Sequence, residues 1–276
     1  MDPKFDFWAD LKEPGPRQKS VACTYASLAS PEIFRWLEPL KQRPYPHRKF
    51  WEWAYICEVL HERGLLAEGK RGLGFAVGQE PLAAFFATHG CQIVATDLAE
   101  ESLEARWDAN GQHAKELSNL NHFKVCDQQT LERNVTLRAV DMNDIPADLR
   151  GFDFVWSSCS FEHLGSMELG KKFVGNMCDC LKPGGVAVHT TEFNVYSDQE
   201  TVEVGGDVIF RRRDIEEMAA IAAGRGCDMV GRDYFLGDTP LDLYVDSPPY
   251  KHNPHLKLAL HGFVATSFGV IVVKRP

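Results

Sequence analysis

The sequence lacks the features that mark membrane, secreted and nucleic-acid-binding proteins. No uninterrupted apolar run approaches the ~20 residues that a membrane-spanning helix needs, and residues 1–16 lack the apolar core of a signal peptide. Lys and Arg number 30 against 39 Asp and Glu, which gives a net charge of −9. Such a field would not attract a polyanion. We therefore expect a cytoplasmic protein with no membrane span and no nucleic-acid partner.

Paired cysteines are scarce as well. The chain has eight cysteines but no C-x-x-C pair, and only Cys178 and Cys180 lie close together in the sequence. Zinc sites and disulfide frameworks need recurring pairs at defined spacing, so neither is indicated. We expect reduced, mostly buried thiols.

Apolar runs and helix-like segments do alternate along the chain. The runs typical of strands begin at Arg71 and fall at residues 92–96, 135–140, 152–157, 186–191, 229–236 and 268–273. Helical spacing predicts helices over residues 31–40, 50–66, 79–89, 99–112, 166–181 and 211–223. This alternation predicts an α/β fold with a doubly wound, mostly parallel sheet, in which the two late strands form an antiparallel pair.

The economical domain division places an N-terminal helical extension at residues 1–66 and the sheet domain at 67–276. Substrate loops are expected at residues 194–210, an inserted loop or hairpin, and at residues 237–261, a Pro-rich loop. The extension is interpreted either as a packing arm or as a lid over the ligand, with Tyr25 and Trp36 as contacts.

The stretch from Arg71 to Asp97 reads as strand, glycine-rich turn, helix, strand and acid. Glycines let the backbone approach a ligand, and an acid about twenty residues after the turn can accept hydrogen bonds from a ribose diol. The G-x-G-x-x-G spacing of dinucleotide-binding proteins is absent. The spacing G-x-G-x-G fits instead at Gly74, Ala76 and Gly78, with one Gly to Ala change.

This stretch resembles motif I of the class I S-adenosylmethionine-dependent methyltransferases. FDFVWSSCSFEHL is similar to the family's fourth strand with the loop after it, and LKPGGVAVHTT to the next helix end and fifth strand. The resemblance covers residues 70–195 or so and implies a Rossmann-like fold with S-adenosylmethionine as cofactor. It also implies a carboxylate on the ribose (Asp97) and an acid and apolar neighbour at the adenine (Asp141 and Met142).

The residues assigned to the cofactor through this resemblance are Gly74, Ala76, Gly78, Glu80, Asp97, Leu98, Asp141, Met142 and Ser158. Two positions depart from the family pattern. Gly72 stands where an acid usually precedes the first glycine, and Ala76 replaces the middle glycine. We expect Glu80 or backbone carbonyls of the turn to receive the methionine ammonium instead.

Polar side chains also follow the strands that end near residues 157 and 191. His163 is the preferred catalytic base because imidazole titrates near neutral pH, and Glu162 and Glu192 are expected to orient it or bind acceptor hydroxyls. The alternatives are a packed or capping imidazole and solvated carboxylates.

The segment YVDSPPYKHNPHLKL supplies Asp246, Tyr250, His252 and His255 as candidate acceptor contacts. Its His-x-x-His resembles half of a metal site but lacks a third ligand, so no metal is predicted. Arg211 opens a basic run that is either a solvated face or a contact for an anionic group on the acceptor.

These residues favour O-methylation of a small polar acceptor, with a sugar or glycoconjugate preferred. The alternatives are N-methylation or methylation of another small metabolite. A nicotinamide-dependent oxidoreductase and a non-catalytic binding scaffold are less favoured.

Overall fold

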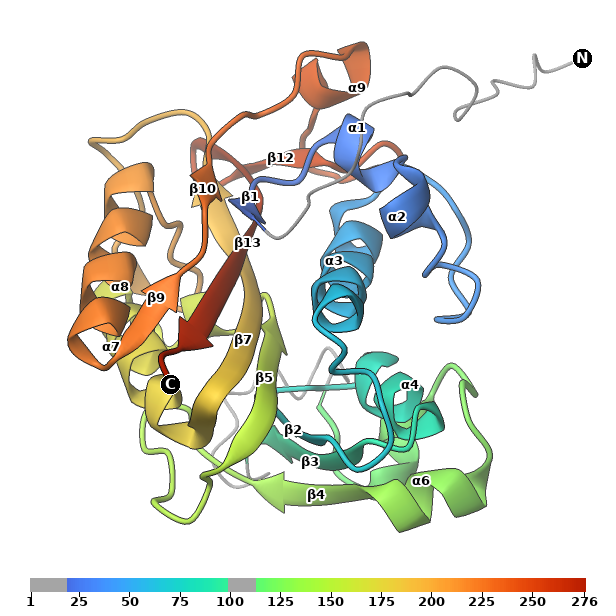
Figure 1. The fold of residues 1–276 in the computed structure, drawn as a ribbon. Coiled ribbons are helices and arrows are strands. Elements are labelled where there is room, and N and C mark those ends of the chain that lie inside the picture. The colour runs from blue at the N-terminus through green and yellow to red at the C-terminus, as the bar shows by residue number, and fades with distance from the viewer. Residues whose placement is uncertain (1–18, 99–112) are drawn as a thin grey trace, which may run out of the picture.

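The structure is a computed structural model and describes residues 19–98 and 113–276. Its centre is a nine-stranded sheet (Figure 1) in the order β11-β12-β13-β7-β5-β2-β3-β4, with β9 pairing on β13. The parallel strands are β2 (Arg71–Gly74), β3 (Gln92–Asp97), β4 (Val135–Ala139), β5 (Phe152–Ser158) and β7 (Leu181–Asn194). The antiparallel pairs join β13 (Phe263–Lys274) to β7 and to β9 (Cys227–Met229).

Helices cover both faces of this sheet. One hydrophobic cluster joins Phe154 and Trp156 of β5 to α3 (Arg48–Glu62) and α4 (Leu82–Thr88). A second cluster joins Val155 of the same strand to α7 (Met167–Met177) and α8 (Arg212–Gly224). Alternate residues of a strand face opposite sides, so each central strand feeds both clusters. The predicted doubly wound α/β fold with an antiparallel C-terminal pair is confirmed.

Local signals place most helix ends. Ser166 begins α7 by accepting a hydrogen bond from the amide of Leu169 at 3.2 Å, and α3 ends just before Gly64, whose φ is +65°. The helix predicted at 31–40 stops early, as α2 (Pro31–Phe34), and continues as turns. Pro39 has no backbone N–H and disfavours the helical conformation at the preceding residue. The helix predicted over residues 99–112 lies outside the described residues.

The segment expected as a loop at 237–261 contains regular structure. It holds α9 (Pro240–Leu243), β11 (Val245–Asp246) and β12 (Lys257–Leu260), and the two strands widen the sheet beyond β13. Thr239, with Pro after it and Asp242 three residues on, forms the capping box of α9. The strand expected at 229–236 is divided into β9 and β10 (Arg232–Asp233).

Outside the main sheet, a short pair of strands lies near α7. β6 (Gly165–Ser166) pairs antiparallel with β8 (Val204–Gly205), which lies in the other segment that was expected as a loop. The remaining helix on the α4 side is α6 (Gln128–Asn134). Within the residues described, no helix is both long and apolar enough to cross a bilayer.

The N-terminal part packs into the same core. β1 (Ser20–Val21) pairs with β10, and α1 (Tyr25–Leu28) precedes α2 beside α3 (Figure 1). Tyr25 is buried and its amide donates to Asp242 at 2.7 Å. The Trp36 indole donates to Glu58 of α3 at 2.7 Å. These contacts favour the packing-arm interpretation for both aromatic residues.

Candidate active site

The carboxyl ends of the five parallel strands meet at one edge of the sheet. From β2 the order runs to β3 and β4 on one side and to β5 and β7 on the other. In open α/β sheets the ligand lies beyond the strand ends at this reversal. The candidate residues at these ends therefore lie along one edge of the sheet.

The glycine-rich turn after β2 is shaped by packing and by backbone conformation. A Cβ at Gly74 would lie 2.4 Å from the ring of Trp156, so only glycine fits there. Ala76 has a φ of +46° and Gly78 a φ of +52°, both in the left-handed region. The alanine that departs from the family pattern thus holds a backbone conformation that favours glycine.

Asp97 at the end of β3 is bound to the turn. Its Oδ2 accepts the amides of Gly78 at 3.1 Å and Ala114 at 3.0 Å. Its Oδ1 accepts the amide of Leu98 at 2.9 Å and contacts His113 Nδ1 at 3.0 Å. A ribose diol would bind this carboxylate in place of the contacts from residues 113 and 114.

Glu80 lies just after the turn and is buried. Its Oε1 accepts the indole N–H of Trp156 at 2.7 Å. Burial raises the pKa of Glu80 to about 8, against an ordinary value of 4.5, although the Trp156 hydrogen bond lowers it. A carboxyl group in this environment gains stability as an anion when a cation is placed beside it, as the methionine ammonium would be.

The strand-end residues on the β4 side are less enclosed. Asp141 is exposed and accepts the amide of Asn143 at 2.8 Å, whereas Met142 is only 4% exposed. Leu98 is half-buried. An acid at the surface beside a buried apolar side chain suits an adenine amino group and ring.

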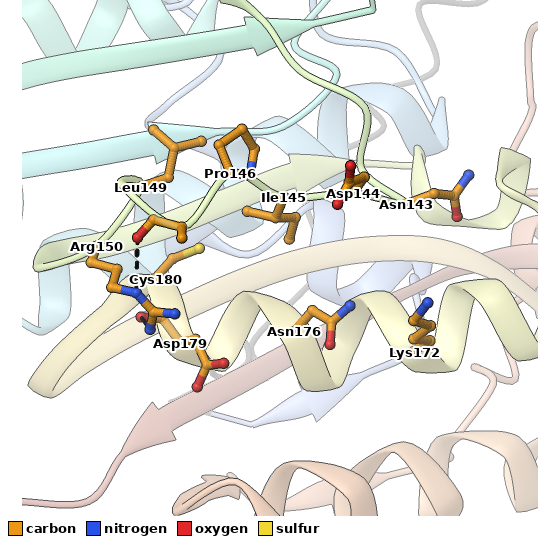
Figure 2. A pocket seen from close by; sticks show the side chains of 11 residues that line it. Asn143, Asp144, Ile145, Pro146, Leu149, Arg150, Lys172, Asn176, Asp179 and Cys180 are labelled. Atoms are coloured by element: carbon orange, nitrogen blue, oxygen red, sulfur yellow. Dashed lines mark hydrogen bonds between the residues drawn. The ribbon is translucent and has the colours of Figure 1, made fainter.

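A hollow of about 270 Å³ lies beside this region, between the segment after β4 and helix α7 (Figure 2). Asn143, Lys172 and Asn176 line it together with Arg150 and Asp179. It contains none of the residues that the sequence assigned to the cofactor or the acceptor. We therefore base the candidate site on the strand ends rather than on this hollow.

A set of buried and half-buried charged and hydroxyl groups lies beyond β5 and β7. We name it the acceptor-side network; it consists of Arg48, Lys49, Glu52, Ser158, Glu192 and Ser267. Glu52 accepts Ser158 Oγ at 3.0 Å, Ser267 Oγ at 2.5 Å and Lys49 Nζ at 2.5 Å. Arg48 forms an ion pair with Glu192 and donates to Ser267 at 3.1 Å.

Charge pairing keeps Glu52 and Arg48 ionised. Burial alone would raise the pKa of Glu52, but Lys49 and Arg48 hold it at about 2. Burial likewise opposes the charge on Arg48, and Glu192 outweighs it, so the Arg48 pKa is raised. Each of these charges has a partner of opposite charge, which offsets the cost of removing it from water.

Glu192 of this network and the neighbouring Glu162 are both buried carboxylates. Glu162 is fully buried and accepts Thr191 Oγ1 at 3.1 Å through Oε2, while its Oε1 has no hydrogen-bond partner among the described residues. Glu192 Oε2 likewise lacks one in the described part of the chain. Ligand atoms of Glu162, Glu192 and Cys159 lie within 4.8 Å of one another. Burial raises the Glu162 pKa to about 6, although nearby His163 lowers it.

His163 is held by a different set of contacts. Its Nδ1 lies 2.7 Å from the carbonyl of Gly206 and 3.1 Å from Asp207 Oδ1. Burial works against protonation, but the Asp207 hydrogen bond and Glu162 outweigh it and raise the His163 pKa. Because a carbonyl oxygen only accepts, His163 Nδ1 carries a proton in this arrangement, and the role of His163 as a base stays a prediction.

The other candidate acceptor contacts divide into two places. Arg211 is buried at the start of α8 and binds Asp214 at 2.7 Å and Glu203 at 2.8 Å, so it lies neither on a solvated face nor against an open anion site. Asp246, Tyr250, His252 and His255 stay together in one segment, where His255 Nδ1 lies 2.7 Å from Asp246 Oδ2.

Sequence reasoning missed Arg48, Lys49 and Glu52. Glu52 did leave a signal, because it is a charged residue within the apolar helical run FWEWAYICEVL and is fully buried on α3. Lys and Glu are almost never fully buried unless paired. Ser267 left no signal, because a serine in a strand is commonplace.

The segment from β2 to β7 also matches a known protein family. Residues 73–189 match the family described as "Methyltransferase domain". The chain contains a class I S-adenosylmethionine-dependent methyltransferase domain. No curated protein matches the chain.

Two solved methyltransferase structures align with the chain at low sequence identity. A provisionally assigned sarcosine dimethylglycine methyltransferase from Galdieria sulphuraria aligns with a TM-score of 0.52 and 16% identity, covering 81% of this chain and 85% of that one. An S-adenosylmethionine-dependent methyltransferase from Clostridium acetobutylicum aligns with a TM-score of 0.45 and 15% identity, covering 82% and 92%. At this identity the likeness to the first structure shows the fold alone.

The cofactor of this methyltransferase domain is S-adenosylmethionine. The residues after β2 and β3 fit it, because they offer a left-handed turn at Ala76 and Gly78, a carboxylate bound to that turn at Asp97 and a buried carboxyl at Glu80.

Proposed function

We propose that the chain methylates a hydroxyl group of a small polar molecule, with Glu162 as the base. The observation that carries the proposal is the buried Glu162 carboxylate, whose Oε1 has no hydrogen-bond partner among the described residues and whose pKa is raised to about 6. An alcohol loses its proton as its oxygen is methylated, and a base with a pKa near the operating pH serves this step best.

The cofactor, when bound, supplies an electrophilic methyl group. The chain's own residues bind and orient the acceptor and receive its proton. Glu162 takes the proton at Oε1, and Thr191 holds the other oxygen at 3.1 Å. Glu192 Oε2 is available to an acceptor hydroxyl on the same side, and Arg48 balances the Glu192 charge. The imidazolium of His163 would stabilise the ionised Glu162 rather than act as the base.

The acceptor-side network defines the class of acceptor. Glu192 Oε2 within it and Glu162 Oε1 beside it have no hydrogen-bond partner among the described residues, and buried oxygens of this kind favour an acceptor with several hydroxyl groups over an apolar one. Sugars and glycoconjugates are accordingly the first acceptors to test.

A second candidate, N-methylation, is favoured by one specific observation. Ligand atoms of Glu162 and Glu192 lie within 4.8 Å of each other, and each carboxylate keeps one oxygen without a hydrogen-bond partner in the described part of the chain. Two carboxylate oxygens at this separation suit a protonated amine, which would pass its proton to Glu162 before attack.

The test combines acceptor discovery with a base variant. The protein is incubated with methyl-labelled S-adenosylmethionine and fractionated metabolites and glycans, and mass analysis then identifies the labelled product and the methylated atom. With that acceptor, Glu162→Gln should lower kcat by about 10²–10⁴-fold and leave the cofactor Kd unchanged in isothermal titration. His163→Gln should lower kcat less. A larger loss in His163→Gln than in Glu162→Gln would refute the assignment of the base.

A further inference from the structure

Three imidazoles meet at the N-terminal end of α3, close to the acceptor-side network. Among the described residues, ligand atoms of His47, His252 and His255 all lie within 4.8 Å of one another. The ring centroids of His47 and His255 are 4.7 Å apart, and those of His252 and His255 are 4.9 Å apart. The sequence showed only half of this arrangement, because His47 comes from the far end of the chain.

Main-chain hydrogen bonds hold the backbones of His47 and His255 next to each other. The amide of Arg48 donates to the His255 carbonyl at 3.0 Å, and the amide of His255 donates to the Pro46 carbonyl at 2.7 Å. His47 and His255 thus form a parallel β-bridge between the start of α3 and the segment before β12. The cluster is built by the main chain and does not depend on flexible side chains alone.

Asp246 organises the other side of the cluster. Its carboxylate is 1% exposed and accepts the amides of Lys251 at 3.0 Å and His252 at 2.9 Å. It also lies 2.7 Å from His255 Nδ1, which leaves Nε2 of that ring for a ligand. His252 adopts a φ of +61°, a left-handed conformation that is uncommon outside glycine and costs energy. The segment is therefore wound around one carboxylate in a way that brings both histidines to His47.

We propose that His47, His252 and His255 bind a divalent transition metal of the Zn²⁺, Co²⁺ or Ni²⁺ type. Neutral imidazole is a preferred ligand of these ions, and three histidines leave a coordination position open to water, as in catalytic zinc sites. A carboxylate that fixes the second nitrogen of a ligating histidine is the usual support for such a site, and Asp246 supplies it. Arg48 next to His47 connects the metal to the acceptor-side network through its ion pair with Glu192.

Metal binding requires one rearrangement. His47 Nδ1 accepts the amide of Lys49 at 3.1 Å, which caps α3. A neutral imidazole that accepts at Nδ1 carries its proton on Nε2. A metal at Nδ1 takes the lone pair that accepts the Lys49 amide, and a metal at Nε2 moves the ring proton to Nδ1. Both end the capping hydrogen bond, so the NMR signal of the Lys49 amide should change when metal binds.

The experiment uses the full chain after removal of metal with a chelator, with Zn²⁺ as the titrant and Co²⁺ as the spectroscopic probe. We expect one Zn²⁺ per chain by isothermal titration, a visible Co²⁺ absorption that Zn²⁺ abolishes, and a shift of the Lys49 amide resonance. None of these readouts depends on methyl transfer, so their failure is distinguishable from a failure of the proposed function.

Matched variants separate the site from adventitious binding. His47→Asn keeps a side-chain cap for α3, and His252→Asn places a residue that tolerates positive φ at that position. Each should weaken Zn²⁺ binding by at least about tenfold. His122→Asn, at an exposed histidine outside the cluster, should leave it unchanged. Absence of a stoichiometric Zn²⁺ site, or equal Zn²⁺ affinity in all three variants, would overturn the proposal.

Discussion

The two sides of the ligand edge draw their side chains from different distances along the chain. On the cofactor side, Asp97 binds the amide of Gly78, 19 residues away. On the acceptor side, Glu52 binds Ser158 and Ser267, which are 106 and 215 residues away. The cofactor side is held by hydrogen bonds from backbone amides of the turn, whereas the acceptor side is held by buried ion pairs.

This difference indicates how each side can vary. A turn, an acid and a helix start within one βαβ unit bind a common ligand with few side chains, so the unit carries its own specificity. The acceptor side joins side chains from α3, β5, β7 and β13, which lie in separate parts of the chain. Buried charges there must be changed together, because one unpaired charge in the interior is costly.

The largest expected effect tests the dependence of the acceptor side on paired charge. Arg48→Met leaves Glu192 without its cation, and we expect the free energy of unfolding to fall by about 3–5 kcal/mol in urea denaturation. The control is Arg225→Met at the Arg225–Asp179 pair, in which both side chains are exposed, and the loss there should be at most about 1 kcal/mol. Equal losses in the two variants would remove the contrast between buried and exposed pairs.

A substitution of Asp97 on the cofactor side should weaken the binding of S-adenosylmethionine. Asp97→Asn removes the negative charge that would receive the ribose hydroxyls, and charge-assisted hydrogen bonds contribute about 1.5–3 kcal/mol each. We expect the Kd for S-adenosylmethionine to rise about tenfold to a hundredfold in isothermal titration. Asp141→Asn, at an exposed acid, should raise it less. The comparison fails if Asp97→Asn binds the cofactor as the unchanged protein does.

The Glu80 carboxyl predicts a pH dependence of stability. Its pKa is raised to about 8 in the folded protein from an ordinary value of 4.5, so the folded state binds the proton more tightly than the unfolded state. The stability from this group is complete below pH 4.5 and is lost as the pH rises to about 8. The slope is about 1.4 kcal/mol per pH unit.

Glu80→Gln keeps an acceptor for the Trp156 indole and cannot ionise. Urea denaturation at several pH values should show a flatter pH dependence for this variant in the window between the two pKa values. A variant whose stability follows the same slope as the unchanged protein would show that Glu80 is ionised in the folded state.

The smallest effect concerns the turn itself. Ala76 has a φ of +46°, and a left-handed conformation costs an alanine roughly 1–2 kcal/mol. Glycine removes this cost but loses more conformational entropy on folding, so Ala76→Gly should raise the free energy of unfolding by at most about 1 kcal/mol. Ala83→Gly, inside α4, should instead lower it by about 1 kcal/mol. Thermal denaturation of both variants checks the difference in sign.

Much of the fold and the cofactor side could be predicted from the sequence, because both depend on short-range patterns. The helical spacing over residues 50–66 and the alternation at 135–140 predicted elements that the structure confirms as α3 and β4. The regular structure in 237–261 was missed, although Thr239 and Asp242 form a recognisable capping box. Sequence spacing alone gave no means of finding the pairing of β12 with β13, since strand partners are set by contacts across the chain.

The polar residues likewise divide into those that local sequence patterns identify and those that only the packing of distant segments brings together. The sequence alone determined a sheet with a glycine-rich turn and the strand-end acids Asp97, Asp141, Glu162 and Glu192, because periodicity and turn chemistry act over a few residues. Only the tertiary structure decided that His163 is held by Asp207, that Arg48 balances Glu192 and that His47 joins His252 and His255. Burial and charge balance depend on which distant segments pack together, and no local pattern specifies that choice.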